Sequence, residues 1–149
     1  MAPYAAQKPL AFLLLLGMAI FGALSSATTG NFDRRLGDLQ RVGNALAAYK
    51  QQHGRYPLQG EKDLVIGLDP AASEFSKLVP GLLAQLPRDP RLLADPNRQY
   101  LYFSNGTDFK FITHGPEDMG FVQKKKPTLV DPRRPQHAYG IWTAGAVTW

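Results

Sequence analysis

Residues 36–49, LGDLQRVGNALAAY, decide the fold of this chain. Apolar side chains recur in this stretch at spacings of three and four, which places them on one face of an α-helix: Leu36, Leu39, Val42, Leu46 and Tyr49. We expect this stripe to pack against the rest of the chain. The other faces of the helix are polar, and to them we assign Arg35, Asp38, Arg41, Asn44 and Gln52.

The helix that carries this stripe is predicted over residues 33–53. Asn31 or Asp33 can cap its start, because short polar side chains accept the free N–H groups of a first turn. Gly54 is a natural stop, and Pro57 follows it. Gly30 is the candidate bend between this helix and the segment before it.

The segment before this helix carries no charge between Lys8 and Asp33. Its apolar run from Pro9 to Leu24 continues through small residues to Thr29, which gives about the 20 residues that a helix needs to cross a bilayer. A retained anchor and a cleaved signal both fit, since Lys8 supplies a short positive region and residues 25–27 are small. We assign residues 1–30 to this segment and residues 31–149 to the domain behind it. Packing within the bilayer is assigned to Leu13, Leu16, Ile20 and Leu24.

Two stretches rich in aromatic and β-branched residues follow an irregular middle at residues 57–98. They cover residues 99–103 (QYLYF) and 109–113 (FKFIT), and the Asn105-Gly106 pair between them predicts a hairpin. Residues 138–143 predict a last strand, so an antiparallel sheet is expected within residues 99–149. Because helix and strands are segregated along the chain, the fold class is predicted as α+β. In this interpretation a transmembrane helix continues into the amphipathic helix, which packs on the small sheet.

Composition limits the classes of protein that this chain can be. It has 149 residues, a formal net charge of +5 and no cysteine, which allows one ordinary domain with an appendage. The absence of cysteine excludes disulfides, thiolate metal sites and a cysteine nucleophile. The three histidines are dispersed, and no serine lies in a nucleophile-elbow pattern. We therefore expect no enzymatic activity and no small-molecule substrate.

Several short motifs occur in an order that resembles a known family. Residues 38–50 (DLQRVGNALAAYK) are followed by residues 54–57 (GRYP), then by residues 86–90 (LPRDP) and by the aromatic start of the sheet at residues 99–100. Over residues 36–120 this order resembles the type IV pilin-like superfamily, most closely the major pseudopilin of type II secretion. The processing signal of that family is different here, because Gly17-Met18 lies inside the apolar run and no glutamate precedes Glu61.

The resemblance implies a structural or assembly subunit like a type II secretion pseudopilin or a minor type IV pilin. Such a subunit is anchored in the inner membrane with its domain in the periplasm, or exported if its leader is cleaved. Its partners would be other pilin-like subunits or secretion-machine proteins. The resemblance assigns subunit or sheet packing to the apolar stripe of residues 36–49. In that family a membrane-embedded glutamate neutralises the amino terminus of the neighbouring subunit, and this chain has no counterpart.

The resemblance also implies one candidate cofactor. Major pseudopilins hold calcium in a late loop through carboxylates and backbone carbonyls, which suit this hard cation. The candidate ligands here are Glu117, Asp118 and Asp131. Solvated turn acids are the alternative interpretation, and we expect no other cofactor.

Basic residues gather between positions 124 and 135, a stretch with three prolines that is predicted as a loop. The patch consists of Lys124, Lys125, Lys126, Arg133 and Arg134. Such charge suits contacts to phosphates, which gives an alternative function: an exported pilin-like binding module that holds DNA or another acidic partner. A solvated loop, or one that faces anionic lipid headgroups, is the simpler interpretation.

Overall fold

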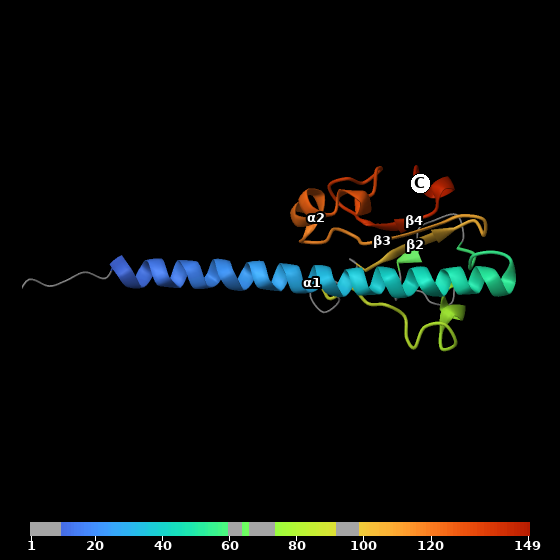
Figure 1. Cartoon of the computed structure of the whole chain (residues 1–149), viewed down its shortest axis with the longest axis horizontal. Helices are drawn as coiled ribbons and strands as arrows, with labels where there is room; N and C mark the ends of the chain where they lie inside the picture. Colours follow the sequence, from blue (N-terminus) through green and yellow to red (C-terminus); the bar gives the residue numbers. More distant parts are fainter. Residues whose placement is uncertain (1–9, 60–63, 66–73, 92–98) are drawn as a thin grey trace, which may run out of the picture.

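The computed structural model describes residues 10–59, 64–65, 74–91 and 99–149, and it describes side chains in these ranges from Gly30 onward, except at residues 64–65. Within these residues, two α-helices and four strands are present (Figure 1): α1 (Leu10–His53), β1 (Leu64–Val65), β2 (Leu101–Ser104), β3 (Phe109–Ile112), α2 (Met119–Lys125) and β4 (Gly140–Trp142). Short 3₁₀ helices are formed by Glu74–Leu78 (η2), Pro127–Leu129 (η3) and Ala144–Ala146 (η4). The predicted α+β class is confirmed.

Helix α1 is much longer than the helix predicted over residues 33–53. It begins at Leu10, runs through Gly30 without the expected bend and ends at His53. Its N-terminal part extends beyond the sheet, whereas its C-terminal half lies alongside it (Figure 1). The end is as predicted, because Gly54 adopts a φ of 72° and its N–H donates to the Lys50 carbonyl at 2.8 Å. The expected boundary between residues 30 and 31 therefore lies inside one helix.

The sheet is antiparallel, with its strands in the order β1-β2-β3-β4. The predicted hairpin is confirmed: Tyr102 of β2 lies opposite Phe111 of β3. Its turn is stabilised by Asn105, whose side-chain oxygen accepts the N–H groups of Thr107 and Asp108 at 3.0 and 2.8 Å. Gly106 in the same turn has a φ of 89°, which L side chains rarely adopt.

Two expectations about the sheet region are wrong. Strand β1 pairs with β2, so the sheet also uses part of the middle that was predicted as irregular over residues 57–98. Residues 99–149 are not sheet throughout, because α2, η3 and η4 lie within them. Pairing between segments more than 30 residues apart leaves no local signal in a two-residue strand, which explains the first error.

The main core lies between the C-terminal half of α1 and one face of the sheet. Four of the five predicted stripe residues, Leu39, Val42, Leu46 and Tyr49, are buried there, and Leu36 is partly buried at the edge of the core. The sheet contributes aromatic rings, among which Tyr100 lies 5.1 Å from Phe111 between ring centroids. The helix comes close to β4 at Gly43, where an added Cβ would lie 3.1 Å from the Ile141 side chain.

A second, smaller core holds Leu101, Ile112 and Ala138, with Trp142 packed against them. Alternate residues of a strand point to opposite faces, so Leu101 and Ile112 face away from the side of Tyr102 and Phe111. Lys110 is buried too: its Nζ contacts Asp131 at 3.0 Å and donates to the main-chain oxygens of Val147 and Trp149. The C-terminal segment therefore attaches to the sheet through Lys110.

Among the residues whose side chains are described, from Gly30 onward, no helix has both the length and the apolar composition needed to cross a bilayer. The residues to which bilayer packing was assigned, Leu13, Leu16, Ile20 and Leu24, belong to α1, but their side chains lie outside the described residues.

Candidate functional site

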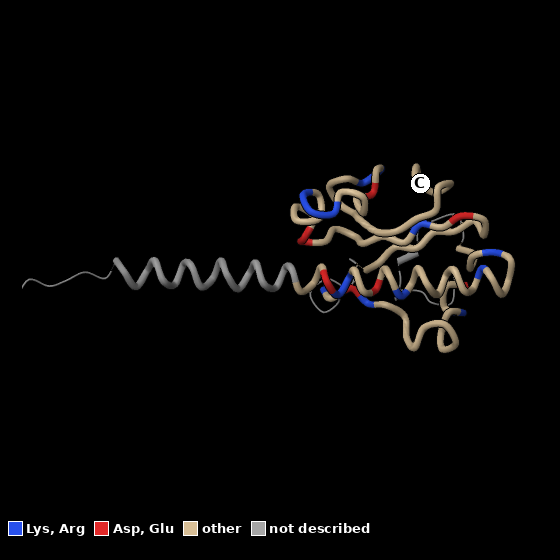
Figure 2. Tube along the Cα trace, viewed as in Figure 1, with Lys and Arg blue, Asp and Glu red and all other residues tan. Residues whose placement is uncertain are grey.

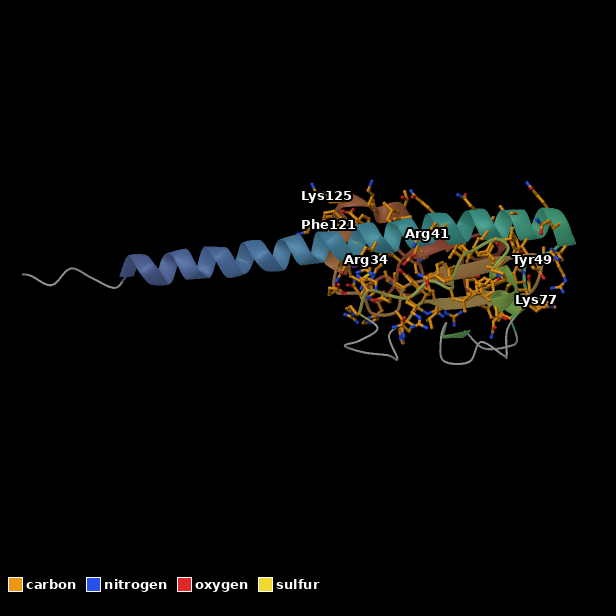
Figure 3. All side chains as sticks on the ribbon, turned by 90° about the horizontal axis from the view of Figure 1, so that it is seen from below. Arg34, Arg41, Tyr49, Lys77, Phe121 and Lys125 are labelled. Atoms are coloured by element: carbon orange, nitrogen blue, oxygen red, sulfur yellow. The ribbon has the colours of Figure 1, made fainter. Side chains whose placement is uncertain are left out.

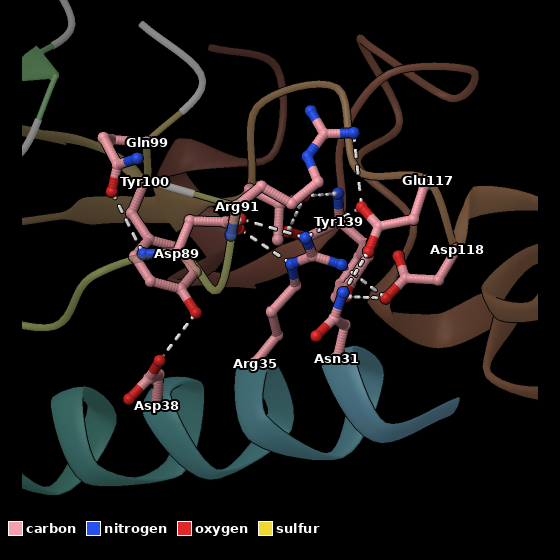
Figure 4. Close-up of polar contacts among 11 residues, drawn as sticks. Asn31, Arg35, Asp38, Asp89, Arg91, Gln99, Tyr100, Glu117, Asp118 and Tyr139 are labelled. Carbon is pink, nitrogen blue, oxygen red and sulfur yellow. Dashed lines mark hydrogen bonds and ion pairs between the residues drawn. The ribbon is translucent and has the colours of Figure 1, made fainter. Parts of the chain in front are cut away.

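Arg35 is the centre of a buried ion cluster between α1, the segment at residues 86–91 and the start of α2 (Figure 4). Its side chain has 0% exposed surface. The guanidinium donates to the two oxygens of Asp89 at 2.7 and 2.9 Å, to Asp118 at 2.7 Å and to Glu117 at 2.9 Å. One side chain of α1 therefore fixes two segments that lie 54 and 83 residues further along the chain.

Neighbouring groups complete this cluster without balancing its charge. Arg91 lies 3.3 Å from Glu117, and Asn31 donates to the same carboxylate at 2.6 Å. The Tyr139 hydroxyl donates to Asp118 at 3.0 Å. Two guanidinium groups thus face three carboxylates, which leaves one negative charge in excess inside the cluster.

Burial and ion pairing act against each other on the pKa values of the two neighbouring acids. Burial opposes the ionisation of Glu117, but hydrogen bonds from Arg35 and Asn31 outweigh it and lower the pKa to about 2. At Asp118 burial dominates and raises the pKa of the carboxyl, although Arg35 lies beside it. Oδ1 of Asp118 is buried and accepts no hydrogen bond. Among the described residues, Arg35 is the only cation that pairs with Asp118.

Polar contacts continue along α1 toward the sheet. Asp38 accepts a hydrogen bond from the Tyr100 hydroxyl at 2.7 Å and also pairs with Arg41. Burial raises the pKa of that hydroxyl, and the neighbouring Asp38 charge raises it further, so Tyr100 remains a donor at neutral pH. Asp38 is therefore held by one neutral hydroxyl and one guanidinium, and it links α1 to the start of the sheet.

The sequence analysis placed Arg35 and Asp38 on the polar faces of the helix, and both assignments are wrong. Arg35 precedes Leu39 by four residues, and Asp38 precedes Val42 by four, so helical periodicity puts both on the buried side. Charged side chains are usually exposed, so residue type alone predicts the wrong face of the helix for both residues. The available signal was a set of acidic residues directly after predicted turns, because a buried arginine needs carboxylate partners.

The three calcium candidates fall into two separate ion clusters. Glu117 and Asp118 pair with Arg35, whereas Asp131 pairs with Lys110 and with Arg134, each at 3.0 Å. Across the described ranges, no group of three or more histidine or acidic side chains is arranged to hold a metal ion. The calcium site stays a prediction, and its candidate ligands already have cationic partners.

The predicted basic patch is divided between two places. Lys124 and Lys125 belong to the last turn of α2, and together with Lys126 they are exposed and have no ionic partner in the described part of the chain. Arg134, by contrast, pairs with Asp131 and donates to the main-chain oxygen of Trp149 at 3.1 Å, and Arg133 donates to that of Thr148 at 3.0 Å. The segment is therefore not one basic loop.

An open groove of about 680 Å³ runs between α1 and the segment at residues 83–88. Its lining combines charged residues of α1, such as Asp33 and Arg34, with Arg88 and with apolar residues including Leu83 and Leu86. Figure 3 shows Arg34 and Arg41 along this part of α1. Arg34 and Arg88 are both exposed, and neither has an ionic partner among the residues described.

Comparisons with protein-family models, with curated proteins and with solved structures return no match.

Proposed function

We propose that this chain is a non-enzymatic structural or assembly subunit of the type IV pilin-like kind, like a type II secretion pseudopilin or a minor type IV pilin. The part of α1 up to Gly30 would anchor it in the inner membrane, with the domain from Asn31 onward in the periplasm. The observation that carries this proposal is α1 itself, a 44-residue helix whose second half is the core helix of an α+β domain.

The dimensions of α1 suit such an anchor. At a rise of 1.5 Å per residue, the helix from Leu10 to Gly30 is about 32 Å long, and a bilayer core is about 30 Å thick. No residue in this range is charged. The first buried ring of the domain, Phe32, comes shortly after it and packs on Phe121 of α2 with ring centroids 5.1 Å apart.

Contacts to other subunits would use the outer face of α1. The apolar stripe is buried in the chain's own core, so it is occupied within each subunit. The opposite face exposes Gln40, Asn44, Ala47 and Gln51 at helical spacing. A neighbouring subunit that packs along α1 would contact this polar and small-residue face.

The missing glutamate favours an accessory role over that of the main filament subunit. A free amino terminus inside the bilayer needs a compensating charge, and residues 9–32 offer none. We therefore place the mature amino terminus outside the apolar run. Mass spectrometry of the membrane-extracted protein tests this, and a methylated amino terminus within residues 9–24 would contradict it.

Cross-linking in membranes tests the assembly role, and the chain is suited to it because it contains no cysteine. The variants Gln40→Cys and Ala47→Cys each place one thiol on the outer face of α1. Thr128→Cys, on the exposed surface of η3, is the matched control. After reconstitution in lipid vesicles and mild oxidation, disulfide-linked dimers are expected for the α1 variants only. Equal dimer yields at all three positions, or none, would argue against packing along α1.

A further inference from the structure

Five exposed basic side chains gather around α1 at the point where it leaves the domain. We name Arg34, Arg88, Lys124, Lys125 and Lys126 the basic collar. Arg34 belongs to α1, and Arg88 lines the same groove as Arg34. The three lysines belong to the end of α2, which is held against α1 by the Phe32–Phe121 ring contact and the Arg35–Asp118 ion pair. Figure 3 shows Arg34 and Lys125 at this end of the domain, with Tyr49 and Lys77 at the other.

At this end of the domain most of the described acidic side chains are paired inside the fold, whereas the basic side chains of the collar are exposed. Among the described acids near this end, Asp89, Glu117 and Asp118 pair with Arg35, and Asp38 pairs with Arg41. Asp33 is exposed and has no ionic partner among the described residues. The five collar residues point outward, and none has an ionic partner in the described part of the chain. Figure 2 shows lysine and arginine positions in blue on α2 and on the part of α1 that follows its grey segment. The outward surface is therefore positively charged.

This charged surface lies directly beside a sequence that has no charge at all. The uncharged residues end at Phe32, and Arg34 is two residues further on. A helix that crosses a bilayer with residues 10–30 would bring Arg34 to the level of the headgroups. The ring contact to Phe32 would bring the end of α2 to the same level.

We propose that the basic collar docks the domain onto anionic phospholipid headgroups. Each lysine or arginine near such a surface raises the affinity of the protein for it by about fivefold. Guanidinium groups also match the geometry of phosphate oxygens. The inference rests on the proposed membrane anchoring, which sets the height of the collar. A nucleic acid would need the same surface to be free of the membrane, so the collar fits lipid better than DNA.

Lysine footprinting of the full chain tests the collar. The protein is reconstituted in phosphatidylcholine vesicles, with or without about one third phosphatidylglycerol, and briefly acetylated, and the modified lysines are quantified by mass spectrometry. Lys124, Lys125 and Lys126 should react several-fold more slowly in the anionic vesicles. Lys50 and Lys77, near the opposite end, should react equally in both. The protection should disappear at about 1 M salt, where the Debye length is about 3 Å.

Paired variants show whether charge causes the protection. Lys124→Gln/Lys125→Gln removes two collar charges that touch no described partner. The affinity of the collar for the anionic surface should then fall by about 25-fold, so most of the protection of Lys126 should be lost. Lys50→Gln/Lys77→Gln removes two charges elsewhere and should leave Lys126 protected. Equal reactivity of the collar lysines in both kinds of vesicle would overturn the proposal, as would protection by added duplex DNA but not by phosphatidylglycerol.

Flotation of the same samples separates this inference from the proposed function. A chain that floats with neither kind of vesicle would contradict the membrane anchor. A chain that floats with both but shows no difference in footprint would contradict the collar alone. Flotation with anionic vesicles only, reversed by salt, would support the collar and contradict the anchor.

Discussion

Replacing Arg35 with methionine should destabilise the domain strongly and in a pH-dependent way. Methionine keeps much of the side-chain volume but removes all hydrogen bonds to Asp89, Glu117 and Asp118. Glu117 would keep Arg91 and Asn31, and Asp89 would keep the N–H of Arg91. Asp118 is fully buried and would lose the one cation that pairs with it among the described residues, so most of the effect should come from this carboxylate.

The size of that effect has an upper limit, because Asp118 can take up a proton instead of staying charged. Holding an aspartate of ordinary pKa, about 3.9, in its neutral form at pH 7 costs about 4 kcal/mol, at 1.36 kcal/mol per pH unit. The same cost is about 1.5 kcal/mol at pH 5. The Arg35→Met variant should therefore lose about 3–4 kcal/mol at pH 7, within the range for a broken buried ion pair, and clearly less at pH 5.

Urea unfolding of the full chain in detergent micelles measures this difference, with the fluorescence of Trp142 and Trp149 as the signal. Arg34→Met is the matched control, because Arg34 is the adjacent residue, exposed and without an ionic partner in the described ranges. The control should change the free energy of unfolding by less than about 0.5 kcal/mol. A loss under about 1 kcal/mol for Arg35→Met, or the same loss at both pH values, would refute the reasoning.

Three further predictions concern single contacts. The pKa of Glu117 is lowered to about 2, so its contribution to the free energy of unfolding should be complete above about pH 4.3 and be lost as the pH falls toward 2. In acid titrations the Glu117→Gln variant should lack this part of the loss of stability. A titration curve identical to that of the unmodified chain would contradict the prediction. Lys110→Met should cost about 3 kcal/mol in urea unfolding, because Asp131 loses a buried partner; a cost under 1 kcal/mol would argue against this role. Gly37→Ala should stabilise the domain by about 0.5–1 kcal/mol, since nothing lies near its added Cβ. Gly140→Ala should destabilise it by more than about 3 kcal/mol, because its Cβ would overlap the Phe111 carbonyl. Similar melting temperatures for the two variants would contradict this.

The parts of the fold with strong local signals could be predicted from the sequence. The spacing of Leu39, Val42, Leu46 and Tyr49 predicted a packed helix face, and the Asn105-Gly106 pair predicted the hairpin. Both signals depend only on helical periodicity and on turn chemistry within a few residues. They therefore do not require knowledge of distant contacts.

The ion cluster and α2 could not be predicted in this way, because both depend on contacts between distant segments. Arg35 has the spacing of a core residue and the chemistry of a surface residue, and only the position of Asp89 and Asp118 in space decides between them. Helix α2 has seven residues, too few to be stable alone, and is held by Phe121 on Phe32 and by Asp118 on Arg35.

The continuity of α1 through Gly30 has a consequence for how the domain is oriented. With no hinge between residues 10 and 53, the angular position of the domain about the helix axis is set by the number of residues that precede it. One residue inserted between positions 24 and 31 would rotate the whole sheet by about 100° and move it by 1.5 Å relative to Leu10. Seven inserted residues would bring the sheet back to within about 20° of its original direction. The length of the segment before Asn31 thus sets the direction in which the sheet faces relative to Leu10.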